Sequence, residues 1–206
     1  DGTTNLDVVD IDGAVDMAST LQVDGVITTS DGMIITTADN SDTLTLVSTD
    51  ADALSSPNLV LYRNSSSPAD GDQLGYIHFD GRNDNSQDVT YAKFLVHTDD
   101  VSDGEEDGDV FLQVMTAGSL QNYVSMLAVE NQPEVVINDG SIDMDFRVES
   151  NGNANMLFVS GGNDVVGIGA EGDLGVGLHV KVADASVSAV NSAADELVLE
   201  NSASCG

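Results

Sequence analysis

Hydrophobic and polar residues alternate along most of this chain in short runs. In the run from Tyr91 to His97, Ala92, Phe94 and Val96 occupy one face of an extended strand and the intervening residues occupy the other. Turn residues interrupt these runs, and nine aspartates are followed directly by glycine, a pair that tolerates the positive φ of tight turns. The pattern predicts an all-β chain of many short strands. The best candidate for a helix is Ser186 to Glu196.

The runs divide the chain into three regions. Residues 1–54 and 138–206 carry short runs, whereas residues 55–137 carry longer alternating runs and all four tyrosines. We expect short shaft strands in the two flanks and an inserted antiparallel β-sandwich-like module in the middle. The expected strands are Leu6–Ile11, Ala14–Met17, Thr20–Val26, Met33–Thr37, Thr43–Ser48, Leu59–Arg63, Leu74–Asp80, Thr90–His97, Val110–Thr116, Asn122–Glu130, Ile142–Glu149, Met156–Ser160, Val165–Ile168, Leu178–Val182 and Glu196–Glu200.

A short repeat supports this division. Residues Asp12–Met17 and Asp139–Met144 are identical at four of six positions and lie on either side of the middle region. Two copies do not make a regular solenoid, which needs about three or more units. The repeat indicates one quasi-repetitive shaft that is interrupted by an insertion.

Composition favours strands and excludes several classes of partner. The chain contains 26 Val, 8 Ile and 13 Thr, which are β-branched and fit a pleated sheet. A net charge of −31 with only five Lys and Arg residues argues against nucleic acid and against an anionic membrane surface. No apolar run approaches the ~20 residues that span a bilayer. Without a signal peptide or an initiator Met, the chain is expected to be a piece of a longer protein.

The two flanking regions are expected to need partner chains. They contain few aromatic residues, and Cys205, the single cysteine, allows no internal disulfide. An isolated pair of short strands is marginally stable in water. Winding identical chains together would bury their apolar faces, so we predict an elongated trimeric β-fibre. A single-chain β-helix is the competing solution, although it usually shows a stricter period.

Several segments resemble tail fibres and related fibrous virion proteins of marine bacteriophages. Asp145–Gly169, which ends in Val-Gly-Ile-Gly, resembles a segment that recurs in these fibres, and Asn5–Gly13 resembles their shaft repeats. Tyr62–Asp84 is similar to an inserted β-module, and Gly177–Lys181 with Asp195–Glu200 is similar to a stretch leading toward their C-terminal part. The resemblance implies a homotrimer located in the virion, with other virion proteins and a host cell-surface glycan or protein as partners. The self-cleaving chaperone domain in which many of these fibres end is not recognised here.

These observations predict a structural, non-enzymatic protein without cofactors. It would be a tail-fibre component whose stiff homotrimeric shaft presents host-attachment regions. One alternative is a glycan- or receptor-binding module centred on residues 55–137, and another is a capsid-decorating head fibre. For glycan binding the candidates are Arg63, Arg82 and Tyr76, through bidentate hydrogen bonds and ring stacking. Alternatively, the two arginines form local ion pairs with Asp70, Asp72, Asp80 or Asp84.

The densest acidic run, Asp99 to Asp109, is the candidate for a calcium site. Oxygen-rich loops bind hard cations, but Val101 stands where the EF-hand pattern needs its second ligand. The candidate ligands are Asp99, Asp103, Asp107 and Asp109. The preferred interpretation is a solvated hairpin loop without metal. Gly161–Asp164 is likewise expected to be a turn, although it resembles the start of a calcium-binding nonapeptide.

The carboxylate pairs and histidines of the sequence do not predict a catalytic site. Close carboxylate pairs of the glycosidase type arise by chance among 36 acidic residues, and there is no Trp to form a sugar platform. If Leu74–Asp80 and Thr90–His97 form a hairpin, facing residues have numbers that add up to about 170. His78 then lies near Ala92 and His97 lies at the other end, so no shared histidine site is expected.

Overall fold

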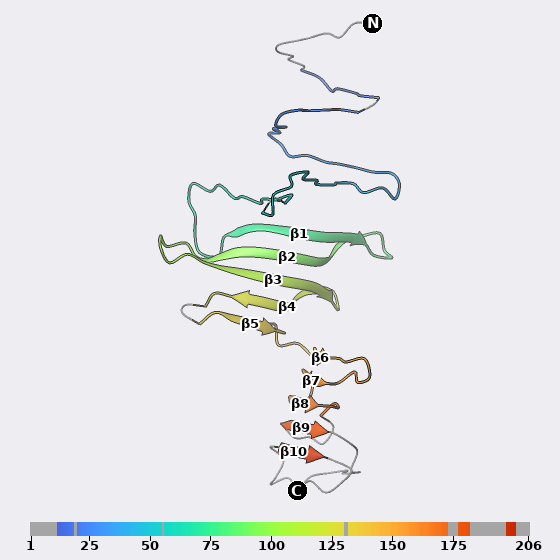
Figure 1. The fold of residues 1–206 in the computed structure, drawn as a ribbon, viewed down its shortest axis with the longest axis vertical. Coiled ribbons are helices and arrows are strands. Elements are labelled where there is room, and N and C mark those ends of the chain that lie inside the picture. The colour runs from blue at the N-terminus through green and yellow to red at the C-terminus, as the bar shows by residue number, and fades with distance from the viewer. Residues whose placement is uncertain are drawn as a thin grey trace. The chain divides into compact units, whose positions relative to one another are not determined.

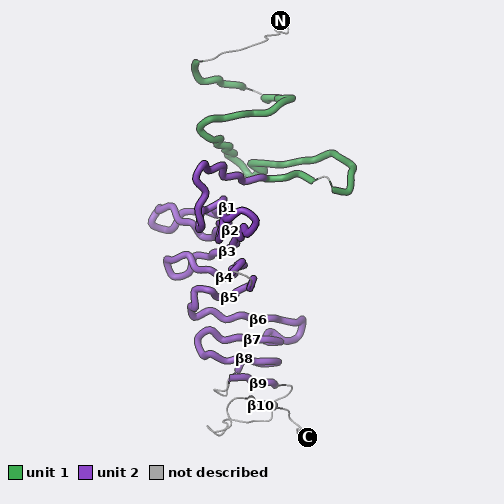
Figure 2. Tube along the Cα trace, turned by 90° about the vertical axis from the view of Figure 1, so that its left-hand side faces the viewer, with its two compact units in different colours: residues 1–59 green, residues 60–206 purple. Residues whose placement is uncertain are grey.

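The computed structural model describes residues 12–18, 20–54, 56–129, 132–172, 177–181 and 197–200. The chain divides into two units, residues 1–59 and residues 60–206 (Figure 2). Within the described residues every regular element is a strand and none is a helix, which confirms the all-β class. The helical candidate at residues 186–196 lies outside the described residues.

The described part of the first unit contains no hydrogen-bonded strand. The strands expected at Ala14–Met17, Thr20–Val26, Met33–Thr37 and Thr43–Ser48 are therefore wrong for the isolated chain, and Leu6–Ile11 lies outside the described residues. A strand needs a neighbouring backbone to pair with. Here the polar contacts are local instead, such as the 2.9 Å hydrogen bond from Ser41 N to Asp39 Oδ1.

Residues 73–137 form one antiparallel sheet with five strands in sequence order (Figure 1). The strands are β1 (Gln73–Arg82), β2 (Asp88–Asp100), β3 (Asp107–Thr116), β4 (Ser119–Leu127) and β5 (Glu134–Ile137). Four of them match predicted runs, whereas β5 was not predicted and the expected strand Leu59–Arg63 does not form. The predicted hairpin register is also confirmed, since His78 pairs with Lys93 and Phe79 pairs with Ala92.

The expected β-sandwich does not form, because these five strands make a single layer. Short connections keep successive strands adjacent, whereas a sandwich requires a connection that crosses to a second sheet. The tightest connection is Ala117-Gly118 between β3 and β4, with φ values of 49° and 84°. Two positive φ angles are typical of the type I′ hairpin turn, whose twist matches that of the flanking strands.

Two of the Asp-Gly pairs lie within strands rather than at turns. Gly81 pairs with Val89 in the β1–β2 ladder, and Gly108 pairs with Thr98 in the β2–β3 ladder. At Gly81 the reason is packing: a Cβ there would lie 3.1 Å from the ring of Tyr91. At these two positions, hydrogen bonding to the neighbouring strand outweighs the local preference of Asp-Gly for a turn.

A second sheet follows, with the order β10-β9-β8-β7-β6. Its strands are β6 (Phe146–Val148), β7 (Leu157–Ser160), β8 (Val165–Ile168), β9 (Leu178–Lys181) and β10 (Leu197–Glu200). The pairs β6–β7 and β7–β8 are antiparallel, but β8–β9 and β9–β10 are parallel, which the alternation of residues did not indicate. Phe158 and Val165 form its buried apolar core among the described residues.

The Val-Gly-Ile-Gly sequence has a steric explanation in this sheet. A Cβ on Gly167 would lie 2.1 Å from the carbonyl oxygen of Ala170, so the chain passes there only without a side chain. Gly169 adopts a φ of 84°, the left-handed region that glycine reaches without penalty. Both glycines are needed by the backbone that leads out of β8.

Candidate functional site

One face of the five-stranded sheet is largely apolar. The register places apolar residues opposite one another in three rows that cross the strands. The first row consists of Ile77, Phe94, Leu112, Val124 and Ile137. The second consists of Gly75, Val96, Val110, Met126 and Val135. The third consists of Phe79, Ala92 and Val114, and it ends in the polar residue Gln121 on β4. We call these residues the apolar face, and none of them carries a charge.

The apolar face is largely open, whereas the opposite face of the same sheet, which we call the covered face, is open only in part. Phe79 is 60% exposed, Met126 51% and Val135 65%. On the opposite face Leu95 and Ser125 are buried. This arrangement is the reverse of a stable single-layer fold, in which water contacts the polar face.

Side-chain hydrogen bonds hold the covered face together. Asp139 Oδ2 accepts hydrogen bonds from Ser125 Oγ at 2.9 Å and from Asn122 Nδ2 at 3.2 Å. Asn122 Oδ1 in turn accepts one from Gln113 Nε2 at 2.7 Å. These contacts fix the segment after β5 over β4. On the apolar face, the Leu61 side chain lies against Gly75, where an added Cβ would be 3.0 Å from Leu61 Cδ1.

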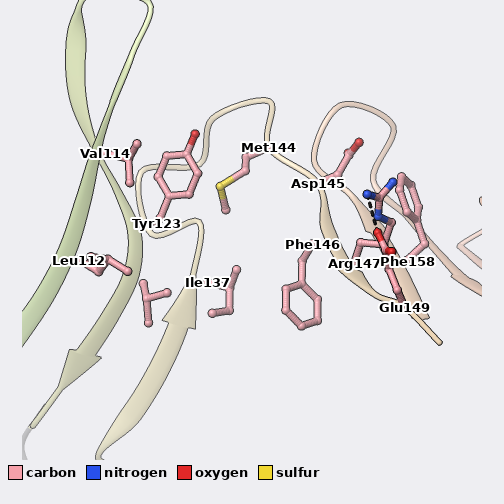
Figure 3. A pocket seen from close by; sticks show the side chains of 11 residues that line it. Leu112, Val114, Tyr123, Ile137, Met144, Asp145, Phe146, Arg147, Glu149 and Phe158 are labelled. Atoms are coloured by element: carbon pink, nitrogen blue, oxygen red, sulfur yellow. Dashed lines mark ion pairs between the residues drawn. The ribbon is translucent and has the colours of Figure 1, made fainter. Parts of the chain in front are cut away.

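Two hollows lie in the apolar face. The larger, of about 590 Å³, lies between the end of the first sheet and β6 (Figure 3). Leu112, Ile137, Met144 and Phe146 surround this common opening, and the Arg147–Glu149 ion pair, at 2.6 Å, lies to one side. A second hollow of about 360 Å³ is lined by residues of β3, β4 and β5 and by the loop before β5. Most residues of both walls are apolar, and the charged ones are Asp145, Arg147 and Glu149 in the larger hollow and Glu134 in the smaller.

The predicted glycan-binding residues do not form one site. Arg63 forms an ion pair with Asp72, and Arg82 Nε donates to Asp88 Oδ1 at 3.0 Å. The local ion-pair interpretation is thus correct for both arginines, although Asp88 was not among the expected partners. Tyr76 and Arg82 are six positions apart on β1, which is about 20 Å along a strand.

Tyr76 instead belongs to a cluster that the sequence did not indicate. Its ring stacks on His78, with centroids 4.2 Å apart and an interplanar angle of 21°. Lys93 Nζ lies 5.9 Å from the centroid of the Tyr76 ring, within cation–π range. Among the Lys and Arg side chains that the structure describes, Lys93 alone has no carboxylate at ion-pair distance. The i, i+2 spacing of Tyr76 and His78 was the available signal, together with the register that places Lys93 opposite His78.

The acidic run forms the loop between β2 and β3, as predicted, and uses carboxylates to hold its own backbone. Asp100 Oδ1 accepts a 2.6 Å hydrogen bond from Ser102 N, which lowers the pKa of Asp100. Glu106 Oε2 accepts from Gly104 N at 3.1 Å, and Asp109 Oδ1 accepts from Ala128 N at 2.9 Å. In the part of the chain that the structure describes, no group of three or more His, Cys, Asp or Glu residues could hold a metal ion.

The other metal-like and catalytic candidates are also separate. His78 lies on β1, His97 lies near the far end of the β1–β2 ladder and stacks on Phe111 at 4.9 Å, and His179 is buried in β9. Gly161–Asp164 forms the turn between β7 and β8. Cys205 lies outside the described residues.

Comparisons add no family to this description. Searches against protein-family profiles, curated proteins and solved structures find no match. A search for a membrane-spanning helix among the described residues finds none of sufficient length and hydropathy. The residues of the chain and their geometry therefore carry the functional argument.

Proposed function

We propose that this chain is a non-enzymatic structural segment of a bacteriophage fibre, in which three copies wind into a stiff shaft that presents host-attachment regions. The observation that carries the proposal is that residues 12–54 expose large apolar side chains and form no paired strand. Large apolar side chains recur there, with Val26 90% exposed and Ile34 93% exposed, and no described part of this segment pairs as a strand. Extended, apolar and unpaired backbone of this kind is what neighbouring copies would cover.

The exposed surface supports association on energetic grounds. Burying an aliphatic side chain of this size stabilises by about 1.5–3 kcal/mol. Within residues 12–54, the side chains of Val26, Ile34 and Val47 are at least 74% exposed and would gain in this way on association.

Charge is compatible with this role. A net charge of −31 for each copy keeps an assembly rich in strand edges soluble and separate from other assemblies. Repulsion between copies is a cost, but salt near seawater strength shortens the screening length to a few Å and weakens it.

The resemblance to fibrous virion proteins of marine bacteriophages supports the placement in a virion, with other virion proteins as neighbours. A capsid-decorating head fibre would be held together by the same burial of apolar side chains between copies, but it would attach to the virion at a different point. The tail-fibre assignment is preferred because the resembling segments are those of tail fibres.

Sedimentation of the purified chain at micromolar concentration tests the proposal. We expect a species of three times 21.4 kDa that sediments more slowly than a sphere of that mass. A compact monomer would overturn the fibre assignment.

A second candidate function is glycan or receptor binding by the middle region, and the Tyr76–His78–Lys93 cluster is the observation that favours it. An exposed ring can stack on a sugar, and an ammonium group without a carboxylate partner can bind an acidic substituent. Glycan-array binding that disappears in Tyr76→Ala and Lys93→Ala, and persists in Arg63→Ala and Arg82→Ala, would support it. Equal loss in all four variants would contradict this location.

A further inference from the structure

We infer that the apolar face of the five-stranded sheet is a self-association surface, and that its occupant is the same face of further copies of this chain. Each sheet would supply the second layer that its neighbour lacks. The inference rests on the proposed homotrimer and goes further, since it names the surface within residues 73–137 that holds the copies together.

The size of the face suits such an interface. Seven of its large side chains are more than one-third exposed, and they are Ile77, Phe79, Phe94, Leu112, Met126, Val135 and Ile137. With up to about 200 Å² for each large side chain, they present on the order of 600–700 Å². A stable protein interface buries about 800 Å² on each partner. The two hollows extend the apolar area toward the second sheet and provide space for protruding side chains of a neighbour.

Charge favours a copy of the chain over an unrelated partner. The molecule carries 36 acidic residues, yet the three rows hold none, so two of these faces can meet without bringing carboxylates together within the contact. A partner recognised by charge complementarity would be attracted to the acidic loops and not to this uncharged face. Copies related by closed symmetry cover every such face at once.

The covered face cannot serve the same purpose. Leu95 and Ser125 are already buried there, and Asp139 ties the segment after β5 to β4. Its exposed part is the Tyr76–His78–Lys93 cluster, which is polar and positively charged. The two faces are therefore assigned opposite directions, with the apolar face toward other copies and the cluster toward solvent.

Two exposed positions on opposite faces of the sheet provide a matched test. Leu112→Glu and Tyr76→Glu introduce the same residue and the same change in charge, at side chains that are 42% and 51% exposed in the single chain. In sedimentation of the full chain, we expect Leu112→Glu to weaken association by at least 100-fold and Tyr76→Glu to leave it within a few-fold of the parent. If the parent is trimeric and Leu112→Glu remains equally trimeric, the inference is wrong while the proposed fibre stands. A monomeric parent overturns both.

A cysteine footprint gives the same answer without disrupting the interface. Met126 and Tyr76 are each 51% exposed in the single chain but lie on opposite faces. In a Cys205→Ser background, we expect a thiol placed by Met126→Cys to react with maleimide at least 10-fold more slowly than one placed by Tyr76→Cys in the assembled protein. In denaturant the two rates should become equal. Equal rates in the assembled protein would contradict the inference, whatever the behaviour of Leu112→Glu.

Discussion

Residues 12–54 and residues 73–137 have similar apolar content, and β-branched residues are more frequent in the first segment, yet only the second segment forms a sheet within the chain. In the second segment, short connections such as Ala117-Gly118 return each strand directly alongside the one before it. In the first, the described residues close no such ladder, and Ile34 remains 93% exposed. The difference shows that strand propensity alone does not make a strand. A neighbour is required, either through a tight turn in the same chain or, in our proposal, through another copy.

The largest loss of assembly is expected from a substitution at Ile34, a side chain that is almost fully exposed in the single chain. Ile34→Asp would be almost neutral for a monomer, because the side chain is nearly fully exposed. In the proposed assembly the same change places a carboxylate in an apolar contact in every copy, at a cost of at least about 1.5–3 kcal/mol per copy. Sedimentation and thermal unfolding would show loss of the trimer. Asn40→Asp, which makes the same change in charge at an exposed turn, serves as the control. An unchanged melting temperature for both variants would contradict the comparison.

The second-largest change in stability is expected at Ala117-Gly118, the turn of the β3–β4 hairpin. Gly118 has a φ of 84°, so Gly118→Val forces a β-branched residue into the left-handed region at a cost of roughly 1–2 kcal/mol or more. We expect a lower melting temperature and faster amide hydrogen exchange in β3 and β4. Ala117→Asn should have the opposite sign, because Asn tolerates the φ of 49° at that position better than Ala. Destabilisation by both variants would show that the turn does not control this pairing.

A smaller effect is expected at the repeated hexapeptide. Before the second copy, Asn138 has a φ of 66°, and its side chain donates to Ile142 O at 2.8 Å and accepts from Ile142 N at 3.0 Å. In the first copy the equivalent position is Ile11, which cannot form these bonds. Asn138→Ala should cost about 1–3 kcal/mol, because two partly buried backbone groups lose their partners. Denaturant unfolding measures it, with Asn151→Ala in an exposed turn as the control. Equal stability of the two variants would contradict a role for this clamp.

The smallest effect concerns the ion pair before β1. The Arg63 guanidinium, followed by the Ala69 backbone N–H, lowers the pKa of Asp72 below its ordinary value of 3.8. Because the pKa is lower in the folded state, the contribution to stability is present above pH 3.8 and is lost as the pH falls through the folded value. Arg63→Gln should move the pKa of Asp72 back toward 3.8 in a carboxyl NMR titration. Asp100, whose pKa is lowered by Ser102, should be unaffected. A pKa of Asp72 that does not change would show that Arg63 is not the cause.

The middle region was the most predictable part of the fold. Alternation over Thr90–His97 and Val110–Thr116 defined β2 and β3, because long period-two runs have one stable pairing once their ends are joined. The sequence also indicated the register around His78 to within one residue. The missed strand β5 is only four residues long, and it is recognisable as a strand only through its pairing with β4.

The candidate sites were less predictable. Arg63, Arg82 and Tyr76 are near one another in sequence, but extended backbone separates residues rapidly, and each arginine has an acidic partner closer to it. The cluster of Tyr76 with Lys93 depends on which residues of β1 and β2 face each other. The parallel pairs β8–β9 and β9–β10 were likewise missed, because alternation is the same in parallel and antiparallel strands.

The sequence by itself determined the all-β class, most strands of residues 73–137 and the acidic hairpin loop, since these follow from side-chain period and turn chemistry over short distances. Only the tertiary structure decided that those strands form one layer, that its apolar face is the open one, and that residues 12–54 find no strand partner among the described residues. The physical reason is that hydrogen bonding between strands and the burial of a sheet face are relations between distant segments. Local residue preferences indicate which segments can take part, but not which of them meet.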